Sequence, residues 1–336
     1  MSATPQPPYY LGIDVGGTNT KAGVVDDNGQ SLSLSKVPTE VPEGLERGLQ
    51  NMQQVVANAL KQANLTLDDI RAIGLVTPGP MDIHAGRLLK PHNLPTWGRV
   101  EILKVVRERF GGKPTILQND ANAAAYGEYW VGAARDADIL VFWTLGTGIG
   151  TGIVINGNIL EGAHSHGGES GHIIIAMDGG RYCDTGQYGT LEAYCGAKSV
   201  IRRTQEALNS GRDSVLNNLI SEGQKLTPLL IAETAENGDE LANEIIMETA
   251  RCMGVGTTTL MHTVDPNMVL IGGAMTFGRH ETDIGRRFLQ RIRAEVDHRA
   301  FAIPASKTTI TYAELGGDAG YIGAAGCARL KYGGMS

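Results

Sequence analysis

Three glycine-rich turns have the residue types needed to bind phosphate. Residues 14–21, 145–152 and 272–274 each lie where a run of β-forming residues ends. Such a turn exposes backbone N–H groups that can hold phosphate oxygens, and ligands bind at the carboxyl ends of strands in open α/β sheets. Any one turn could be an ordinary hairpin, but three of them favour a nucleotide site. The candidate nucleotide-binding residues are Asp14, Gly16, Gly17, Thr18, Asn19, Lys21, Gly146, Thr147, Gly148, Gly272 and Gly273.

The first turn also carries side chains suited to a metal–nucleotide complex. Asp14 could bind, through a water molecule, the Mg²⁺ ion that accompanies ATP. The Thr18 hydroxyl adds a hydrogen-bond donor for phosphate. We expect Gly17 to adopt a positive φ, which a β-branched residue disfavours. The chain has neither a G-x-x-x-x-G-K-[ST] loop nor the HRD and DFG motifs of protein kinases. The nucleotide site is therefore of another kind.

A second chemical signal is the pair Asn119-Asp120, which directly precedes an alanine-rich stretch at 121–130. The stretch predicts a helix, and Asp120 is placed as its N-cap. Capping alone would explain this residue. A carboxylate at the start of a helix could also accept a proton from a substrate hydroxyl.

Alternating strand and helix patterns position these residues and predict an α/β protein. The order strand, glycine turn, strand occurs at residues 9–25 and again at 139–155, which suggests two lobes built on a related plan. Further strands are predicted at 70–76, 115–117, 268–271 and 308–312. Helices are predicted at 45–62, 100–110, 121–130, 198–208, 241–264 and 319–330.

The composition limits the function classes. The chain has 336 residues, which suits two lobes of ordinary size, and its formal net charge is −7. No basic run is present to displace the counterions of nucleic acid, so no nucleic-acid partner is expected. No stretch of eighteen apolar residues predicts a membrane span, and no membrane partner is expected. Residues 1–8 read as a flexible leader rather than a signal peptide, so the four cysteines are expected to be reduced thiols in the cytoplasm.

Taken in order, the motifs resemble those of the ROK family (repressors, open reading frames and kinases) of bacterial sugar kinases, and within it the glucokinase branch. The matching segments span about residues 9 to 195, and two later segments extend the match. They are Asp14-Val-Gly-Gly-Thr18, Thr77-Pro-Gly-Pro80, Pro91-His-Asn-Leu-Pro95 with Trp97, Asn119-Asp-Ala-Asn122, Leu145-Gly-Thr-Gly-Ile-Gly150, Gly168-Glu-Ser-Gly-His172, Gly272-Gly273 and residues 316–325.

The resemblance implies a two-lobed ribonuclease H-like fold of the actin and hexokinase type. A small lobe would comprise residues 9–134 and be completed by a C-terminal helix at 319–336, with a large lobe at 135–318. The lobes would close over ATP and the sugar, and the protein would be a homodimer or homotetramer. Many repressors of the family carry a helix-turn-helix before the first glycine motif. Only thirteen residues precede Asp14 here, which favours an enzyme.

The resemblance also assigns roles to individual residues. It implies that Asp120 is the catalytic base and that Asn119 and Asp120 contact the sugar. The Gly79 backbone would approach the sugar closely. The side chains implied around the sugar hydroxyls are those of Glu169, His172 and Glu192. For the two glutamates, an ordinary solvated carboxylate is the alternative.

The zinc site implied by the family is degenerate in this chain. Relatives use a histidine and three cysteines, of which only His172 and Cys183 remain, and Thr185 and Thr190 replace the other thiols. A neutral hydroxyl is a poor zinc ligand beside thiolate. Asp184 could supply a third ligand, but its position is off the pattern. We therefore expect no structural zinc and no metal ligand set here.

The activity implied is transfer of the γ-phosphoryl group of ATP, with Mg²⁺, to the 6-hydroxyl of a hexose. Glucose is the first candidate. The alternatives of the same class are fructose, mannose, allose, N-acetylmannosamine and N-acetylglucosamine. A non-catalytic sugar sensor or repressor is the alternative from another class. An intact Asp120 argues against it.

Overall fold

The computed structural model describes residues 5–334, which form two compact units. Of the described residues, unit 1 comprises 5–136, 152–167 and 314–334, and unit 2 comprises 137–151 and 168–313. These units differ from the predicted lobes mainly in 152–167 and 314–318, which group with unit 1. Residues 1–4 of the predicted leader lie outside the described part.

The first five-stranded sheet has the order β3-β2-β1-β4-β8. Its strands are β1 Tyr9–Val15, β2 Asn19–Val25, β3 Ser35–Pro38, β4 Ile70–Thr77 and β8 Thr115–Asn119. β1 pairs antiparallel with β2 and parallel with β4, and β8 runs parallel to β4. The carboxyl ends of β1, β4 and β8 therefore share one edge of the sheet. A small sheet is formed by β5 Met81–Asp82, β6 Arg87–Leu89 and β7 Arg99–Val100.

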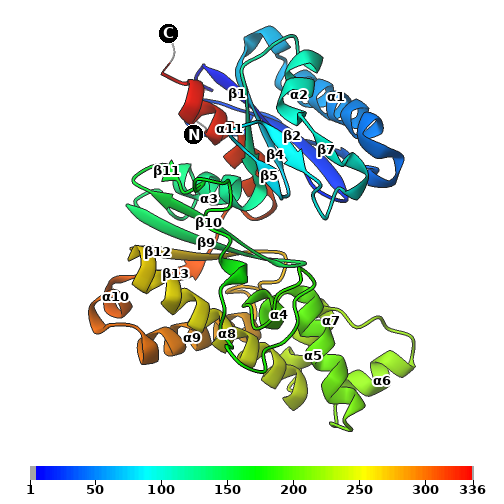
Figure 1. Cartoon of the computed structure of the whole chain (residues 1–336), viewed down its shortest axis with the longest axis vertical. Helices are drawn as coiled ribbons and strands as arrows, with labels where there is room; N and C mark the ends of the chain where they lie inside the picture. Colours follow the sequence, from blue (N-terminus) through cyan, green and yellow to red (C-terminus); the bar gives the residue numbers. More distant parts are fainter. Residues whose placement is uncertain (1–4, 335–336) are drawn as a thin grey trace. The chain divides into compact units, whose positions relative to one another are not determined.

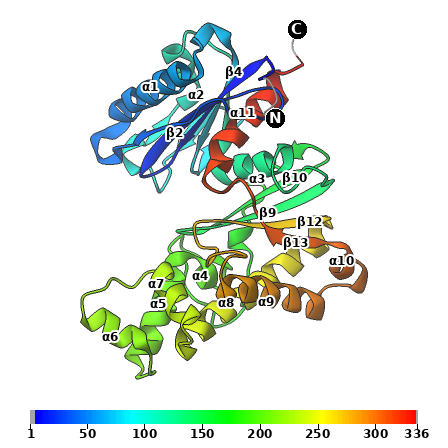
Figure 2. The same cartoon turned by 180° about the vertical axis from the view of Figure 1, so that it is seen from behind.

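Helices cover both faces of the first sheet (Figures 1 and 2). They are α1 Gly44–Ala63, α2 Ile102–Arg109, α3 Asp120–Trp130 and α11 Ala319–Tyr332. The amphipathic helix α1 buries Leu49, Met52 and Val56 against the sheet core. On the other face, α11 lies so close to the sheet that a Cβ on Gly12 would lie 1.8 Å from the Tyr321 carbonyl oxygen. Small residues therefore let the C-terminal helix pack onto the N-terminal strands.

The second sheet repeats the plan of the first, with the order β11-β10-β9-β12-β13. Its strands are β9 Ile139–Leu145, β10 Ile149–Ile155, β11 Asn158–Ile159, β12 Met268–Gly273 and β13 Thr309–Tyr312. β12 runs parallel to both β9 and β13, as β4 does to β1 and β8. The predicted internal repeat is thus present in the strand order of both sheets.

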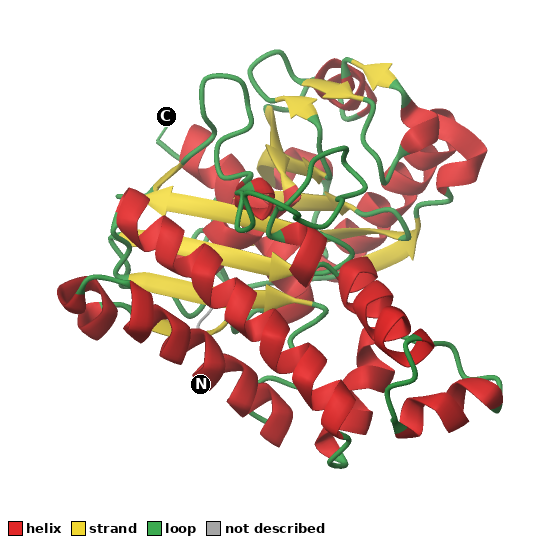
Figure 3. Ribbon diagram, turned by 60° about the horizontal axis from the view of Figure 1, so that its bottom comes forward, coloured by secondary structure: helices red, strands yellow, loops and turns green. Residues whose placement is uncertain are grey.

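The helices of unit 2 form the layer seen in front of this sheet in Figure 3. They are α4 Glu192–Cys195, α5 Ala197–Asn209, α6 Val215–Ser221, α7 Pro228–Glu236, α8 Glu240–Val264, α9 Asp283–Arg299 and α10 Ala302–Lys307. Helix α9 was not predicted, because its many arginines make the apolar periodicity of the sequence less evident. Its buried Ile284, Phe288 and Ile292 do recur at helical spacing. Within residues 5–334, no helix is both long and apolar enough to cross a membrane.

Candidate active site

The first glycine turn joins β1 to β2 and is hydrogen-bonded to Thr39. The Gly16 N–H donates to the Asn19 carbonyl oxygen at 2.9 Å and closes the turn. The buried Thr39 hydroxyl donates to the Gly16 carbonyl oxygen at 2.7 Å, and the Thr39 N–H donates to the Thr18 carbonyl oxygen at 2.9 Å. Thr39 therefore provides donors for two carbonyl groups of the turn.

The expectation that Gly17 needs a positive φ is wrong. Gly17 is not among the residues of the described chain with positive φ. Instead, a Cβ on Gly17 would lie 3.2 Å from the Asn93 carbonyl oxygen, which is closer than ordinary van der Waals contact. The space for a side chain at position 17 is therefore limited by Asn93 rather than by the backbone conformation.

Asp14 lies opposite Lys21 in the β1–β2 pair and faces the start of α11. A Cβ on Gly320 would lie 2.2 Å from Asp14 Oδ2, so the carboxylate is packed against the helix backbone. Burial raises the pKa of Asp14, while the charge of Lys21 lowers it by less. Lys21 Nζ also donates to the Gly317 carbonyl oxygen. Unit 1 therefore places a desolvated carboxylate and an ammonium group beside the glycine turn.

The second and third glycine turns lie together in unit 2. The Met275 N–H, two residues past Gly273, donates to the Leu145 carbonyl oxygen at 2.9 Å, where the second turn begins. Gly273 has φ +90°, and a Cβ there would lie 2.3 Å from the same oxygen. Both the conformation and the packing at this position therefore require glycine.

Glu192, predicted to contact sugar, lies against the second turn. Its Oε2 accepts from the Ile149 N–H at 2.8 Å, and a Cβ on Gly148 would lie 2.2 Å from that oxygen. Its Oε1 accepts from the Cys183 thiol at 3.3 Å. Both oxygens of Glu192 therefore have a donor within unit 2.

The helix bearing Asp120 begins one residue earlier than predicted. Asn119, not Asp120, is the N-cap of α3, because Asn119 Oδ1 accepts from the Ala121 and Asn122 N–H groups at 2.9 and 3.3 Å. Asp120 is the first helical residue and is exposed. The same geometry brings Gly79 next to the pair, since a Cβ on Gly79 would lie 3.7 Å from Asn119 Nδ2. Asn119 can thus cap the helix with its oxygen while its amide nitrogen faces Gly79.

Glu169 directly precedes a short 3₁₀ helix, Ser170–His172, of which His172 is the last residue. The His172 N–H donates to the Glu169 carbonyl oxygen at 3.1 Å, and the Glu169 side chain is exposed. His172 Nδ1 is buried without a hydrogen-bond partner in the described chain.

The segment of the degenerate zinc site is held by hydrogen bonds. The Thr185 hydroxyl lies 3.1 Å from Cys183 Sγ and 2.7 Å from Gln187 Oε1. The buried Thr190 hydroxyl accepts from the Ala193 N–H. Asp184 pairs with Lys198 at 3.4 Å. Among the described residues, no group of three or more His, Cys, Asp and Glu side chains could hold a metal ion. These residues do not fit a family-type zinc.

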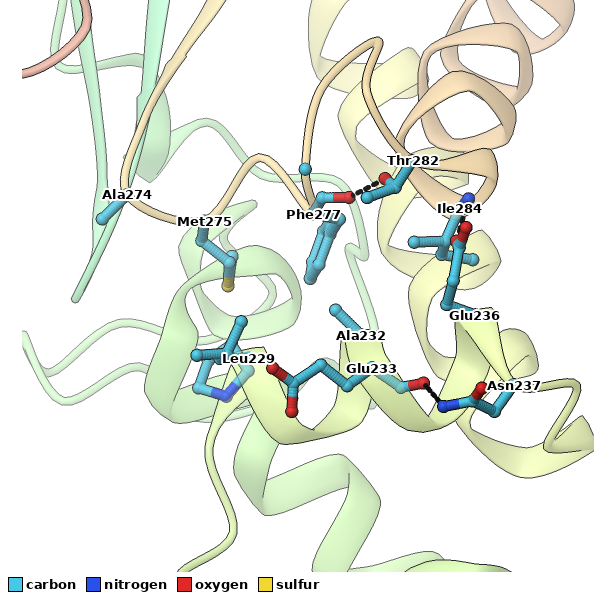
Figure 4. A pocket seen from close by; sticks show the side chains of 12 residues that line it. Leu229, Ala232, Glu233, Glu236, Asn237, Ala274, Met275, Phe277, Thr282 and Ile284 are labelled. Atoms are coloured by element: carbon cyan, nitrogen blue, oxygen red, sulfur yellow. Dashed lines mark hydrogen bonds between the residues drawn. The ribbon is translucent and has the colours of Figure 1, made fainter.

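A cavity of about 360 Å³ directly follows the third turn in unit 2 (Figure 4). Its lining comes from the segment after Gly273, from α7 and from the start of α9. Ala232, Met275 and Phe277 make it largely apolar. Glu236 is already engaged, because its carboxylate accepts from the first N–H groups of α9 at 2.9 and 2.7 Å. The sequence analysis did not identify this cavity, although the Gly272-Gly273 motif adjoins it.

Comparison with known proteins identifies the family of the chain. The ROK family model matches residues 10–330, and the chain belongs to the ROK family. Its fold is the ribonuclease H-like fold of actin and hexokinases, with two related sheets. It is 32% identical over 317 residues to a glucokinase of Halalkalibacterium halodurans, covering 94% of this chain and 93% of that protein.

A solved structure and a regulator extend the comparison. The structure of a ROK glucokinase from Streptomyces griseus in complex with glucose and AMPPNP is 30% identical, with a TM-score of 0.76 over 96% of this chain and all of that one. A xylose repressor of Caldicellulosiruptor bescii is 28% identical over 293 residues, covering 87% of this chain and 70% of the repressor. The family thus contains both enzymes and regulators.

Proposed function

We propose that the protein is an ATP-dependent glucokinase that transfers the γ-phosphoryl group to the glucose 6-hydroxyl. The observation that carries the proposal is an exposed Asp120 on the first turn of α3, beside a capping Asn119 and Gly79, in a chain about 30% identical to glucokinases. A carboxylate in this position can accept both a hydrogen bond and the proton of the attacking hydroxyl, which a kinase requires.

Asp120 is the proposed base. It would accept a hydrogen bond from the attacking hydroxyl and take its proton as the phosphoryl group moves in line through a loose transition state. Positioning and charge stabilisation dominate such a reaction, so Asp120 needs no strongly raised pKa. Asn119, Gly79, Glu169, His172 and Glu192 are the proposed sugar contacts.

The nucleotide would be held by the glycine turns. The 16–19 turn would bind phosphate oxygens through its backbone, with Lys21 nearby. Asp14 would hold Mg²⁺ through water, and the bound ion would neutralise phosphate charge. In unit 2 we propose that the adenine base of ATP occupies the apolar cavity next to Gly273. Gly146, Thr147, Gly148 and Gly272 would contribute to the same ligand.

The remaining proposals concern the setting of the enzyme. We propose a cytoplasmic protein, because its thiols are free and all four are buried. The homodimer or homotetramer expected from the family stays a prediction. No role for structural zinc is proposed.

The test is a coupled assay of ADP release with MgATP and a panel of hexoses. We expect glucose to give the highest kcat/KM among glucose, fructose, mannose, allose and the two N-acetylhexosamines. A higher value for another sugar would keep the kinase and change its substrate. If no sugar drives ADP release while glucose still binds, the protein is a sensor.

A further inference from the structure

A buried polar side chain lies directly before the proposed base. Gln118, the penultimate residue of β8, has an exposed fraction of only 1%. Its Oε1 accepts from the Asn119 N–H at 2.8 Å and from Asn122 Nδ2 at 3.0 Å. Its Nε2 donates to Glu161 Oε1 at 2.7 Å. All four residues lie in unit 1.

The Glu161 carboxylate determines which way this amide points. An ionised carboxylate can only accept hydrogen bonds, so it selects the NH₂ end of Gln118. The carbonyl end is thereby turned toward the two donors, Asn119 N–H and Asn122 Nδ2. If the amide rotated by half a turn, donors would face donors and a carbonyl oxygen would face a carboxylate. Buried groups left unpaired in this way are costly.

The two donors belong to the residues that start α3. Asn119 caps the helix, and Asn122 completes its first turn. Gln118 therefore connects Glu161, which lies outside the helix, to the Asn119 backbone before Asp120 and to the Asn122 side chain after it. Glu161 is itself part of a closed loop, since its carbonyl oxygen accepts from the Gly167 N–H at 2.8 Å.

We propose that Gln118 and Glu161 are a positioning pair that sets the Asn119-Asp120 backbone for phosphoryl transfer. The inference rests on the proposed function of Asp120. Neither side chain is proposed to touch substrate. Their effect on turnover would come through the placement of the base, to which such reactions are sensitive.

Exchanging the two side chains tests the pair. Gln118→Glu places two carboxylates against each other, and we expect kcat to fall about tenfold or more. Glu161→Gln keeps an acceptor for Gln118, so we expect less than about a threefold loss. The double variant restores a donor–acceptor pair with reversed polarity, because the amide introduced at position 161 can donate to the carboxylate introduced at position 118. We expect it to recover kcat to within about threefold of the wild type.

One further readout and two further variants distinguish a positioning role from a general loss of structure. KM for ATP should stay unchanged in all variants, because the glycine turns are untouched. The exposed Gln54→Glu change on α1 is a matched control that should leave kcat unchanged. If Gln118→Glu does not fold, Glu161→Ala removes the carboxylate instead. We expect it to lower kcat about fivefold with KM for ATP unchanged.

Two outcomes would overturn the inference. One is a Gln118→Glu protein with kcat within about twofold of the wild type. The other is a double variant no better than Gln118→Glu. Amide hydrogen exchange at residues 119–122 provides a readout that needs no activity, and it should rise in Gln118→Glu and recover in the double variant. A wild-type protein without kinase activity would refute the proposed function. The exchange pattern would then still test whether Gln118 and Glu161 order residues 119–122.

Discussion

At the scale of single residues, Asp120 carries the proposed chemistry. Asp120→Asn keeps the size of the side chain but cannot accept the proton. We expect kcat to fall by roughly two to four decades, as is typical for loss of a general base. The glucose Kd, measured by calorimetry, should change by less than about threefold. Exposed Asp136→Asn is the matched control and should be fully active.

The assignment of Asp120 would be contradicted by a variant that keeps more than about a tenth of the wild-type kcat. Asn119 caps α3, and Asp120 Oδ1 accepts from the Ala121 N–H at 2.9 Å, a bond that the amide oxygen of the variant can keep, so the thermal stability should stay nearly unchanged. A large drop in Tm would instead point to a structural role.

Asp14 makes a prediction about stability and pH. Burial raises its pKa in the folded protein, so ionised Asp14 destabilises the fold at neutral pH. Asp14→Asn removes this cost, and Tm at pH 7.5 should rise while turnover with MgATP is lost. The advantage should shrink as the pH falls through the raised pKa of the folded protein and vanish below the ordinary value of 3.8, where the carboxyl is protonated in both states.

Thermal unfolding of both proteins between pH 4 and pH 8 measures this difference. Exposed Asp213→Asn is the control and should show no such pH trend. A variant less stable than the wild type at neutral pH would show that the Lys21 charge outweighs burial.

At the scale of elements, the β1–β2 turn depends on Thr39. Thr39→Val keeps the shape but removes the hydroxyl that donates to Gly16 and lies 3.0 Å from the Thr20 hydroxyl. We expect a loss of about 1–2 kcal/mol in the free energy of unfolding. KM for ATP should rise about threefold or more because the turn loosens, whereas the glucose Kd should not change.

Thr204→Val is a matched control for this prediction. Thr204 is also fully buried, and its hydroxyl donates to the Val200 carbonyl oxygen within α5. It should lower stability without any change in KM for ATP. Equal kinetic effects of the two variants would remove Thr39 from the support of the turn.

The segment from Ile173 to Thr190 is predicted to be independent of metal. Its hydrogen bonds among Cys183, Thr185 and Glu192 replace a closed ligand set. A structural zinc contributes on the order of 10 kcal/mol to folding in small zinc domains, so its removal is easily detected. We expect EDTA to change Tm by less than about 1 °C, and elemental analysis to find well under one zinc per chain.

One zinc per chain together with unfolding on chelation would refute this prediction. The Cys183→Ala variant distinguishes a role of the thiol as a hydrogen-bond donor from a role as a metal ligand. In a zinc-free protein it should affect glucose phosphorylation through Glu192 alone, by about two- to fivefold in kcat/KM.

At the scale of the whole molecule, the two units hold different parts of the proposed machinery. The proposed base, Asp120, lies in unit 1, and the apolar cavity lies in unit 2. Ala232→Met extends a side chain from α7 into the cavity. We expect KM for ATP to rise about tenfold with the glucose Kd unchanged. Leu229→Met preserves the volume of the lining and is the control. A fully active Ala232→Met enzyme would place the adenine base elsewhere.

Much of the fold could be predicted because its signals are local. The predicted strand at 139–145 matches β9, and the predicted helices at 45–62 and 241–264 are within a residue or two of α1 and α8. Apolar periodicity and glycine turns depend only on near neighbours along the chain. The repeated strand, turn, strand pattern likewise indicated two sheets built on a related plan.

The errors and omissions of the sequence analysis occur where contacts with segments distant in sequence determine the local structure. The sequence contained the Asn119-Asp120 pair but could not tell which residue caps α3, because both types are good caps. The sequence analysis expected a positive φ at Gly17, whereas the structure shows that the Asn93 carbonyl oxygen limits the space at this position. It also gave no indication of the cavity beside Gly273.

The sequence by itself determined the chemical groups: the glycine turns, the Asn119-Asp120 pair and the threonines at positions 185 and 190. Residue types and spacing along the chain are sufficient for that. Only the tertiary structure decided their partners. The bonds from Thr39 to Gly16, Cys183 to Glu192 and Gln118 to Glu161 join segments 9 to 43 residues apart. Such contacts depend on how strands pair and helices pack, and no local pattern of residues encodes them.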